Sequence, residues 1–428
     1  MRRPFVRLRR RLRRTRLFLI FALLGPGIIA AFGGNDPSGI WGYSMAGAQY
    51  GYGLLWVLLF AGISLGICQE MGARMGAVTG KGLADLIREE YGVRVTLFAM
   101  VALLIANFAT TVSEFAGIAA AVQIFTPPES QLLAKRIVVP LVAFGVWMLV
   151  TRGSYKRVER VLLTASLIYI AYVVSAFMAH PHWSQVFAEM LHPQFAIARP
   201  LSPYLFMVIN IIGTTVTPWA QFYIQSSVRD RATKPEEYTP IDPFGGALSA
   251  IIVAFFITVC CAATLFTPGK VPDFNDAGQI ALALKPAAGA LATTLFGIGL
   301  LNAACFGAIT VPLSTAYAIT ESLGWESGLG RRVREAPLFI GVFTFLIVVS
   351  ALVVIFGGQN LSALIILPNI VGGVLLPIIL ILLLRLINDP RLMGKYKNNW
   401  WQNTIAITTT TVMILLSLAL LILQLLPH

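Results

Sequence analysis

The chain has 428 residues, of which 57% are hydrophobic and only 12% are charged, whereas an ordinary soluble domain is about 25% charged. Together with a mean hydropathy of +0.78, this composition excludes a water-soluble globular protein, a disordered chain, a collagen and a secreted disulfide scaffold. The net charge of +13, from 32 Lys and Arg against 19 Asp and Glu, leaves two explanations open: binding of nucleic acid, or membrane topology.

Long apolar segments predict an all-α membrane protein with eleven transmembrane helices, because a span needs about 20 apolar residues. The segments between the spans are short and leave no room for a soluble domain. We therefore predict a basic tail over residues 1–16 and a single transmembrane domain over residues 17–428. In chain order the predicted spans are 17–47, 53–73, 95–125, 134–150, 161–179, 203–227, 245–267, 288–321, 337–357, 362–386 and 402–426.

The positions of the basic residues predict the orientation of the chain. With the N-terminus in the cytoplasm, nearly all Lys and Arg residues fall on the cytoplasmic side, as the positive-inside rule requires. The exceptions are Lys135, Arg136, Arg199, Lys270 and Lys285. Eleven spans then place the C-terminus outside the cytoplasm. Topology thus accounts for the positive charge, and a nucleic-acid partner is not expected.

Two of the predicted spans are interrupted near mid-membrane by glycine, proline and polar residues. The first span contains the run GGNDPSG at 33–39, and the sixth contains GTTVTPW at 213–219. Proline removes a helical N–H group, and carbonyls freed at membrane depth need protein, water or an ion to bind them. Because the breaks are five spans apart, we predict two inverted repeats of five helices, about 17–180 and 201–387, followed by an extra helix at about 402–426.

Asp36 favours a cation site as the explanation of these breaks. The C-terminal ends of half-helices carry partial negative charge, and Asp36 adds a full charge that is costly within the membrane unless it has a partner. A packing kink is the alternative for either break taken alone. Discontinuous helices in matching halves, however, indicate a transport site at the midplane.

Several segments resemble the Nramp family of divalent-metal transporters. Residues 68–74 together with 78–88 are similar to the family's second span and the loop that follows it. Residues 153–160 are similar to the loop between spans four and five, and residues 180–183 resemble the turn after span five. The resemblance extends along nearly the whole chain and implies the LeuT-type fold, in which helices 1 and 6 are broken at mid-membrane.

The resemblance also implies which residues bind the metal, although both site motifs depart from the family pattern. The family's Asp-Pro-Gly-Asn is Asp-Pro-Ser-Gly at 36–39 here, so the carboxylate is kept but Gly39 offers only its backbone. The family's Met-Pro-His is Thr-Pro-Trp at 217–219. Ser38 has two roles open to it, hydrogen bonding to ion-bound water or capping of a half-helix. The implied metal-site residues are Asp36, Ser38, Gly39, Thr214, Thr217 and Asn369, where Thr214 replaces the residue whose carbonyl faces the ion and Asn369 matches a glutamine of span ten.

The missing methionine predicts a preference for hard ions. A thioether suits manganese, iron and other transition ions, whereas the hydroxyl of Thr217 leaves only oxygen donors around Asp36. Mg²⁺ prefers one or two carboxylates and retained water. The pattern resembles the Nramp-related magnesium transporters of prokaryotes, which implies location in a prokaryotic plasma (inner) membrane. Thr217→Met, alone or together with Gly39→Asn, is accordingly expected to improve binding of Mn²⁺ or Cd²⁺.

We therefore expect a secondary-type transporter of divalent cations, above all of Mg²⁺ carried partly hydrated, with Mn²⁺ also accepted. One alternative is a proton-coupled Mn²⁺/Fe²⁺ transporter of the ordinary Nramp type. Another is an organic-solute carrier of the same fold, although Asp36 would repel a substrate carboxylate. An enzyme is not expected, because there is no HExxH motif, no intramembrane His cluster and no plausible nucleophile–base pair. The expected partners are the cation and the lipid bilayer, with no resident cofactor and no obligate protein partner.

Proton coupling is expected to be weak or absent. None of the four histidines lies inside a predicted span, Trp219 cannot titrate, and Thr111 stands where the family has a second acid in span three. Glu114 has two interpretations, as a proton carrier or as a hydrogen-bonded structural acid. Glu70 also has two, a place in the inner vestibule or an ion pair with Arg74 one helical turn later.

Overall fold

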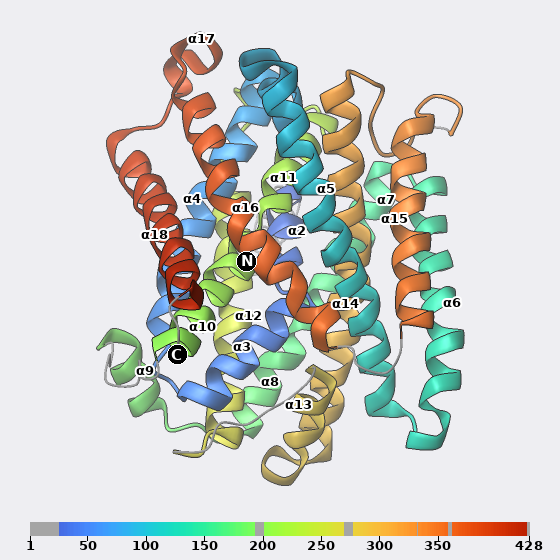
Figure 1. Cartoon of the computed structure of the whole chain (residues 1–428), viewed down its shortest axis with the longest axis vertical. Coiled ribbons are helices and arrows are strands. Elements are labelled where there is room, and N and C mark those ends of the chain that lie inside the picture. Colours follow the sequence, from blue (N-terminus) through green and yellow to red (C-terminus); the bar gives the residue numbers. More distant parts are fainter. Residues whose placement is uncertain (1–24, 193–200, 269–276, 332, 358–361, 426–428) are drawn as a thin grey trace, which may run out of the picture.

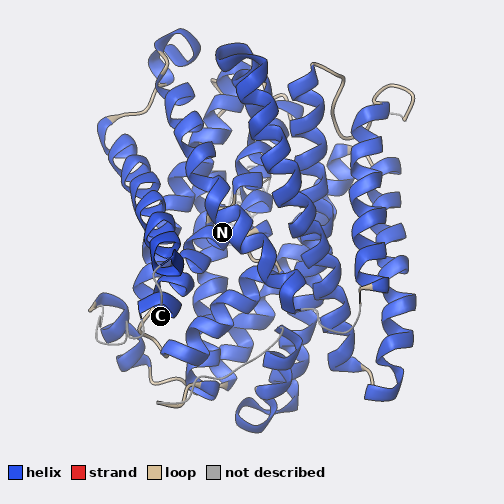
Figure 2. Cartoon of the chain, viewed as in Figure 1, coloured by secondary structure: helices blue, strands red, loops and turns tan. Residues whose placement is uncertain are grey.

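The computed structural model describes residues 25–192, 201–268, 277–331, 333–357 and 362–425. Within these residues every regular element is a helix (Figure 2). The predicted basic tail at 1–16 and the beginning of the predicted first span lie outside the described residues.

The helices follow the apolar segments of the sequence. Up to residue 192 they are α2 (Pro26–Gly33), α3 (Pro37–Tyr50), α4 (Leu55–Thr79), α5 (Leu83–Phe125), η1 (Pro128–Ser130), α6 (Gln131–Arg152), α7 (Tyr155–Ser166), η2 (Leu167–Tyr169), α8 (Ile170–Met178) and α9 (Trp183–Leu191). From residue 201 onward they are α10 (Leu201–Thr215), α11 (Pro218–Asp230), α12 (Ile241–Leu265), α13 (Ala277–Ala283), α14 (Lys285–Leu323), α15 (Pro337–Phe356), α16 (Ser362–Asn388), α17 (Pro390–Met393), η4 (Gly394–Tyr396) and α18 (Trp400–Leu425).

Ten helical segments of the described chain are long and apolar enough to cross a membrane. They correspond to predicted spans two to eleven, which confirms an all-helical membrane protein. The predicted first span is not among the ten, because its described part forms two short helices, α2 and α3. That the first predicted span also crosses the membrane, which would bring the total to eleven, therefore remains a prediction.

Two spans begin well before their predicted first residues, each for a local reason. Helix α5 begins at Leu83 rather than near residue 95 and bends at Gly92, which has a positive φ of 75°. Its first turns carry charged residues, so a search for apolar runs misses them. The fifth span starts with the polar helix α7 and passes through the short 3-10 turn η2 before continuing as α8.

The broken helices lie inside the bundle. In Figure 1, α2, α3, α10 and α11 lie toward the centre, where α12 packs against α2, α3 and α4, and where the long helices α5 and α14 pack against each other. Helices α6 and α15 stand together at one edge and α18 packs on α16 at the opposite edge (Figure 1). Large apolar side chains on these outer helices, such as Phe144, Phe345 and Leu415, are exposed, as expected of a surface that faces lipid.

Prolines at the starts of helices help to fix the two breaks. Helices α3 and α11 begin with Pro37 and Pro218, at the first helical position. At that position the missing N–H costs nothing and the fixed φ of proline suits the helix. Both breaks therefore occur where the sequence predicts them, after Gly33 and after Thr215.

Candidate functional site

Asp36 caps the half-helix α3 at the first break. Its Oδ1 accepts hydrogen bonds from the Ser38 hydroxyl and from the Gly39 backbone N–H, each at 2.7 Å. The side chain is almost fully enclosed, with Asp36 2% exposed. A carboxylate at this position is stabilised by the positive end of the helix dipole, and it retains acceptor capacity because a carboxylate has about four lone-pair sites.

The carbonyls of the first break are bound by neighbouring helices. The Tyr169 hydroxyl lies 3.3 Å from the carbonyl oxygens of both Phe32 and Asn35. The side chain of Asn35 donates to the carbonyl of Ala250 at 3.0 Å. The open backbone is therefore held in place by protein, as a break at membrane depth requires.

The two breaks contact each other. A Cβ atom on Gly34 would lie only 3.0 Å from the carbonyl oxygen of Thr214 and 3.3 Å from that of Thr215. Tyr43 of α3 and Thr215 of α10 form a hydroxyl contact of 2.9 Å. Because the Thr215 hydroxyl donates to Ile211, Tyr43 is the donor in that contact. The last carbonyls of α10, which carry partial negative charge, thus lie beside the Asp36 turn.

A small cavity of about 20 Å³ lies between the breaks. A space of this size holds about one water molecule or a bare ion. Its wall contains four of the predicted site residues together with polar side chains from α5 and the Trp219 indole. The residues around it are Asp36, Ser38, Ala106, Asn107, Thr110, Gly213, Thr214, Thr217, Pro218, Trp219, Pro368 and Gly372.

Three hydroxyl groups of this wall present lone pairs rather than hydrogens, whereas the Trp219 indole N–H in the same wall has no hydrogen-bond partner in the described part of the chain. The Ser38 hydroxyl donates to Asp36, the Thr110 hydroxyl donates to the carbonyl of Ala106 at 2.9 Å, and the Thr214 hydroxyl donates to the carbonyl of Gly34 at the long distance of 3.5 Å. Their hydrogens are therefore directed to other protein atoms and their lone pairs stay available. The Thr217 hydroxyl has no hydrogen-bond partner in the described part of the chain. A cavity lined in this way suits a cation.

Two predicted site residues do not reach the cavity wall as described. Gly39 is not part of the wall, and its backbone N–H binds Asp36. The side chain of Asn369 lies outside the described residues, although Pro368 and Gly372 of the same helix border the cavity. Sequence reasoning missed Asn107 and Thr110. In the sequence these two residues and Glu114 form a polar row at helical spacing along an otherwise apolar span, and this pattern could have identified them.

Trp219 occupies the space beside the first break. A Cβ atom on Gly33 would lie 2.2 Å from Cη2 of the Trp219 indole. The Ser314 hydroxyl donates to the backbone carbonyl of Trp219 at 2.7 Å, which ties this turn to α14. The indole therefore closes one side of the cavity through direct contact with the Asp36 segment.

Glu114 is a buried acid outside this wall. It has no exposed surface, and neither carboxylate oxygen has a hydrogen-bond partner in the described part of the chain. Its carboxyl group occupies the space over Gly307, where a Cβ atom would lie 2.2 Å from its Cδ. Glu114 therefore does not make the hydrogen bonds that its interpretation as a hydrogen-bonded structural acid requires.

The contacts of Glu70 distinguish between its two interpretations, a place in the inner vestibule and an ion pair with Arg74. Arg74 donates to Glu70 through Nε at 2.9 Å and through Nη2 at 3.0 Å, and Gln402 donates to the same carboxylate at 3.2 Å. Burial and the neighbouring Glu70 raise the pKa of Tyr238, whose hydroxyl donates to Glu70. Glu70 is therefore a structural ion-pair partner that joins α4 to α18.

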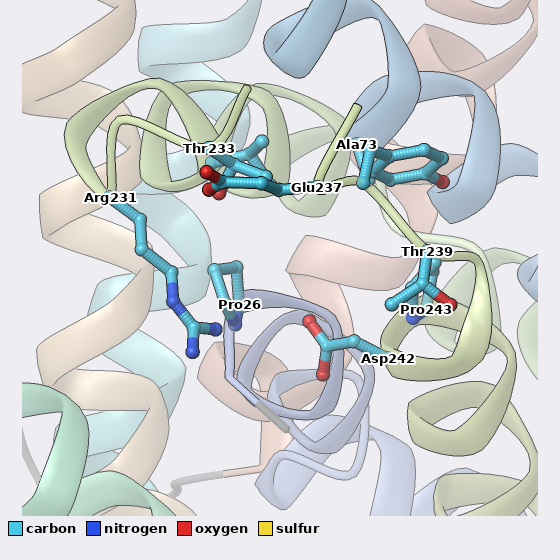
Figure 3. A pocket seen from close by; sticks show the side chains of 10 residues that line it. Pro26, Ala73, Arg231, Thr233, Glu237, Thr239, Asp242 and Pro243 are labelled. Carbon is cyan, nitrogen blue, oxygen red and sulfur yellow. The ribbon is translucent and has the colours of Figure 1, made fainter. Parts of the chain in front are cut away.

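A second, larger pocket of about 250 Å³ lies at the other end of α2. Figure 3 shows Arg231, Glu237 and Asp242 around Pro26. Both carboxylate oxygens of Asp242 are occupied by backbone N–H groups of the α2 N-terminus. Gly25 donates at 2.8 Å, Gly27 at 2.7 Å and Ile28 at 3.3 Å. Asp242 therefore anchors α2 to α12 rather than offering a site for an ion.

Known proteins resemble the chain over almost its whole length. The model of the family Nramp, described as natural resistance-associated macrophage protein-like, matches residues 27–423. Two proteins named divalent metal cation transporter MntH, from Aeromonas hydrophila subsp. hydrophila and from Ralstonia nicotianae, are each 28% identical to the chain. The matches cover 88% and 89% of this chain, and 89% and 86% of those proteins.

Solved structures share the fold. A crystal structure of a mutant of the Eremococcus coleocola manganese transporter has a TM-score of 0.74 at 25% identity and covers 94% of this chain and 86% of that chain. A crystal structure of MhsT in complex with L-phenylalanine has a TM-score of 0.60 at 14% identity, covering 93% of this chain and 97% of that chain. At that identity the likeness concerns the fold alone.

Proposed function

The chain belongs to the Nramp family of divalent metal cation transporters, and we propose that it carries Mn²⁺, with Mg²⁺ as a second candidate ion. The observation that supports this proposal is the cavity at the two breaks, where Asp36 shares the wall with the hydroxyl oxygens of Ser38 and Thr110, whose hydrogens are directed to other protein atoms. Such a site binds a cation and repels an anion or a carboxylate substrate. The alternative of an organic-solute carrier with a carboxylate substrate therefore has little support.

The choice of ion rests on two observations that favour different ions. Relatives are named as manganese and divalent metal transporters, which favours the Mn²⁺ alternative over the sequence-based expectation of Mg²⁺. The cavity wall contains no sulfur or imidazole among its described residues, and a site of oxygen ligands alone also suits Mg²⁺. We therefore keep Mg²⁺ as the second candidate.

We also propose weak proton coupling, cytoplasmic placement of the N-terminus and an inverted repeat of five helices. Trp219, which lies beside the cavity, cannot titrate, and Glu114 is the one acid near it on α5. The distribution of Lys and Arg supports the orientation, and the matching breaks support the repeat. Uptake measured at several external pH values, with and without a membrane potential, tests the coupling.

The test of the proposed function is uptake into proteoliposomes that contain the full chain. We expect saturable uptake of Mn²⁺, weaker uptake of Mg²⁺, and loss of both in Asp36→Ala. The matched control is Glu129→Ala, since Glu129 is an exposed acid in the short 3-10 helix η1, far from the breaks in the sequence. Unchanged uptake in Asp36→Ala would refute the site. Competition by amino acids and not by metals would instead favour the organic-solute carrier.

A further inference from the structure

Asn107 of α5 borders the ion cavity from a helix that has no break near it. The residue is 1% exposed and lies in the same wall as Asp36 and Thr214. An uncharged amide buried in a membrane span is costly unless both of its polar ends are satisfied. The partners of its two ends therefore indicate what it does.

The hydrogen-bond network fixes the orientation of this amide. The Thr315 hydroxyl of α14 donates to the carbonyl of Val311 at 3.0 Å, so it has no proton left for Asn107. The 2.8 Å contact between Asn107 and Thr315 must then be a donation from Nδ2 of the amide to the hydroxyl oxygen. This assignment follows from the network and not from atom labels. It leaves Oδ1, the carbonyl oxygen, as the end directed away from Thr315.

No hydrogen bond in the described part of the chain ends on this oxygen, although the residue is enclosed. Thr110, one turn further along α5, also presents lone pairs because its hydrogen is directed to Ala106. The α5 side of the cavity is thus an oxygen surface made by residues that resemble no metal motif in the sequence. Its chemistry matches that of the opposite side, which carries Asp36.

We propose that Oδ1 of Asn107 is a direct ligand of the transported divalent cation, held in position by Thr315. This inference rests on the proposed function. An amide oxygen is a hard ligand of the kind that binds Mn²⁺ and Mg²⁺. Because it carries no charge, it adds a ligand without adding to the attraction of Asp36, so that the ion can still leave. It also connects the ion to α5 and α14, in addition to the two broken segments.

The test is Mn²⁺ binding by the full chain in detergent, measured by calorimetry and by electron paramagnetic resonance in ¹⁷O-labelled water. Asn107→Ala should weaken binding at least about tenfold and increase the number of water molecules bound to Mn²⁺ by one. Asn107→Asp should tighten binding and slow transport. Thr315→Val should weaken binding less than Asn107→Ala and leave the number of bound water molecules unchanged, as expected of a residue that only positions the ligand.

Asn302→Ala is the matched control, because Asn302 is an asparagine of α14 outside the cavity wall, and it should bind as the unmodified chain does. The inference is overturned if Asn107→Ala keeps both the affinity and the number of bound water molecules while Asp36→Ala loses binding. If the unmodified chain binds no Mn²⁺, or if Asp36→Ala binds normally, the proposed function itself fails. If Asn107→Ala does not fold, Asn107→Asp is the second test. Unchanged affinity in Asn107→Asp also overturns the inference.

Discussion

Asp36 and Asp242 are both buried aspartates at the N-terminus of a half-helix, yet their surroundings differ. Asp242 reaches α2 from a distant part of the chain and binds three backbone N–H groups with its two oxygens. Asp36 caps its own helix: its Oδ1 accepts hydrogen bonds from the Ser38 hydroxyl and the Gly39 N–H, and the backbone N–H of Ser38 also binds its carboxylate. The same residue type thus acts as an anchor in one place and keeps acceptor capacity for a ligand in the other.

The comparison shows why burial of a carboxylate does not by itself identify an ion site. Placing a charge inside the membrane domain is costly, and backbone N–H groups at a helix N-terminus offset that cost for both residues. The difference lies in the other groups around each carboxylate. Around Asp36 these are oxygen atoms with free lone pairs, whereas Asp242 has Arg231 on the same pocket wall.

The largest expected effect comes from the same substitution at both aspartates. Asp36→Asn should reduce Mn²⁺ uptake at least about a hundredfold, because the main Coulomb attraction for a doubly charged ion is lost, while thermal unfolding changes little. Asp242→Asn should lower the free energy of unfolding by about 1–2 kcal/mol and leave Mn²⁺ affinity nearly unchanged. The measurements are Mn²⁺ uptake and the free energy of unfolding, each for both variants. If both variants lose uptake equally at unchanged stability, the distinction between anchor and ligand is wrong.

A smaller effect is expected from filling the contact between Gly33 and Trp219. In Gly33→Ala the new methyl group overlaps the indole, and overpacking of this kind costs about 1–3 kcal/mol. We expect uptake to fall about tenfold and to recover when Trp219→Phe is added, since phenylalanine lacks the overlapping ring atoms. The measurement is uptake by the two single variants and the double variant.

The control for this substitution is Gly145→Ala on α6, where a Cβ atom would have no neighbour within 4 Å. It should behave as the unmodified chain does. Normal uptake in Gly33→Ala would mean that the indole moves freely and does not close the cavity.

The breaks could be predicted from the sequence because glycine and proline act on their own segment of chain. Gly33, Pro37 and Pro218 lie where the helices end and begin, and no distant contact is needed to predict that. Asp36 was predicted as a site residue on the same local basis, and its place in the cavity wall agrees with that prediction without testing it. The apolar length of each span similarly predicted the ten crossing helices of the described chain.

Contacts between distant residues were not predictable in this way. The bond from Gly25 to Asp242 joins residues 217 positions apart, and the role of Asn107 depends on Thr315 of another helix. Gly39 was expected in the metal site because it aligns with an asparagine of the family. That expectation could not take into account that its N–H binds Asp36.

The smallest expected effect concerns the choice between hard and soft ions at Thr217. Thr217→Met should shift the ratio of Cd²⁺ to Mg²⁺ affinity about fivefold, or about 1 kcal/mol, because a thioether is a softer ligand than a hydroxyl and methionine adapts to irregular spaces. Thr217→Val is the matched control, since it removes the hydroxyl without adding sulfur. Calorimetry with both ions gives the ratio. An equal change for Cd²⁺ and Mg²⁺ would mean that Thr217 does not contact the ion.

The companion change Gly39→Asn, expected from the sequence to help, is disfavoured by the structure. A Cβ atom on Gly39 would lie 2.6 Å from the carbonyl oxygen of Gly34 and 2.8 Å from the Thr214 hydroxyl. Because a backbone atom is one of the two neighbours, the turn that holds Asp36 would have to shift. The single change Thr217→Met is therefore the better test of ion hardness, and the double variant should bind both ions more weakly than the single one.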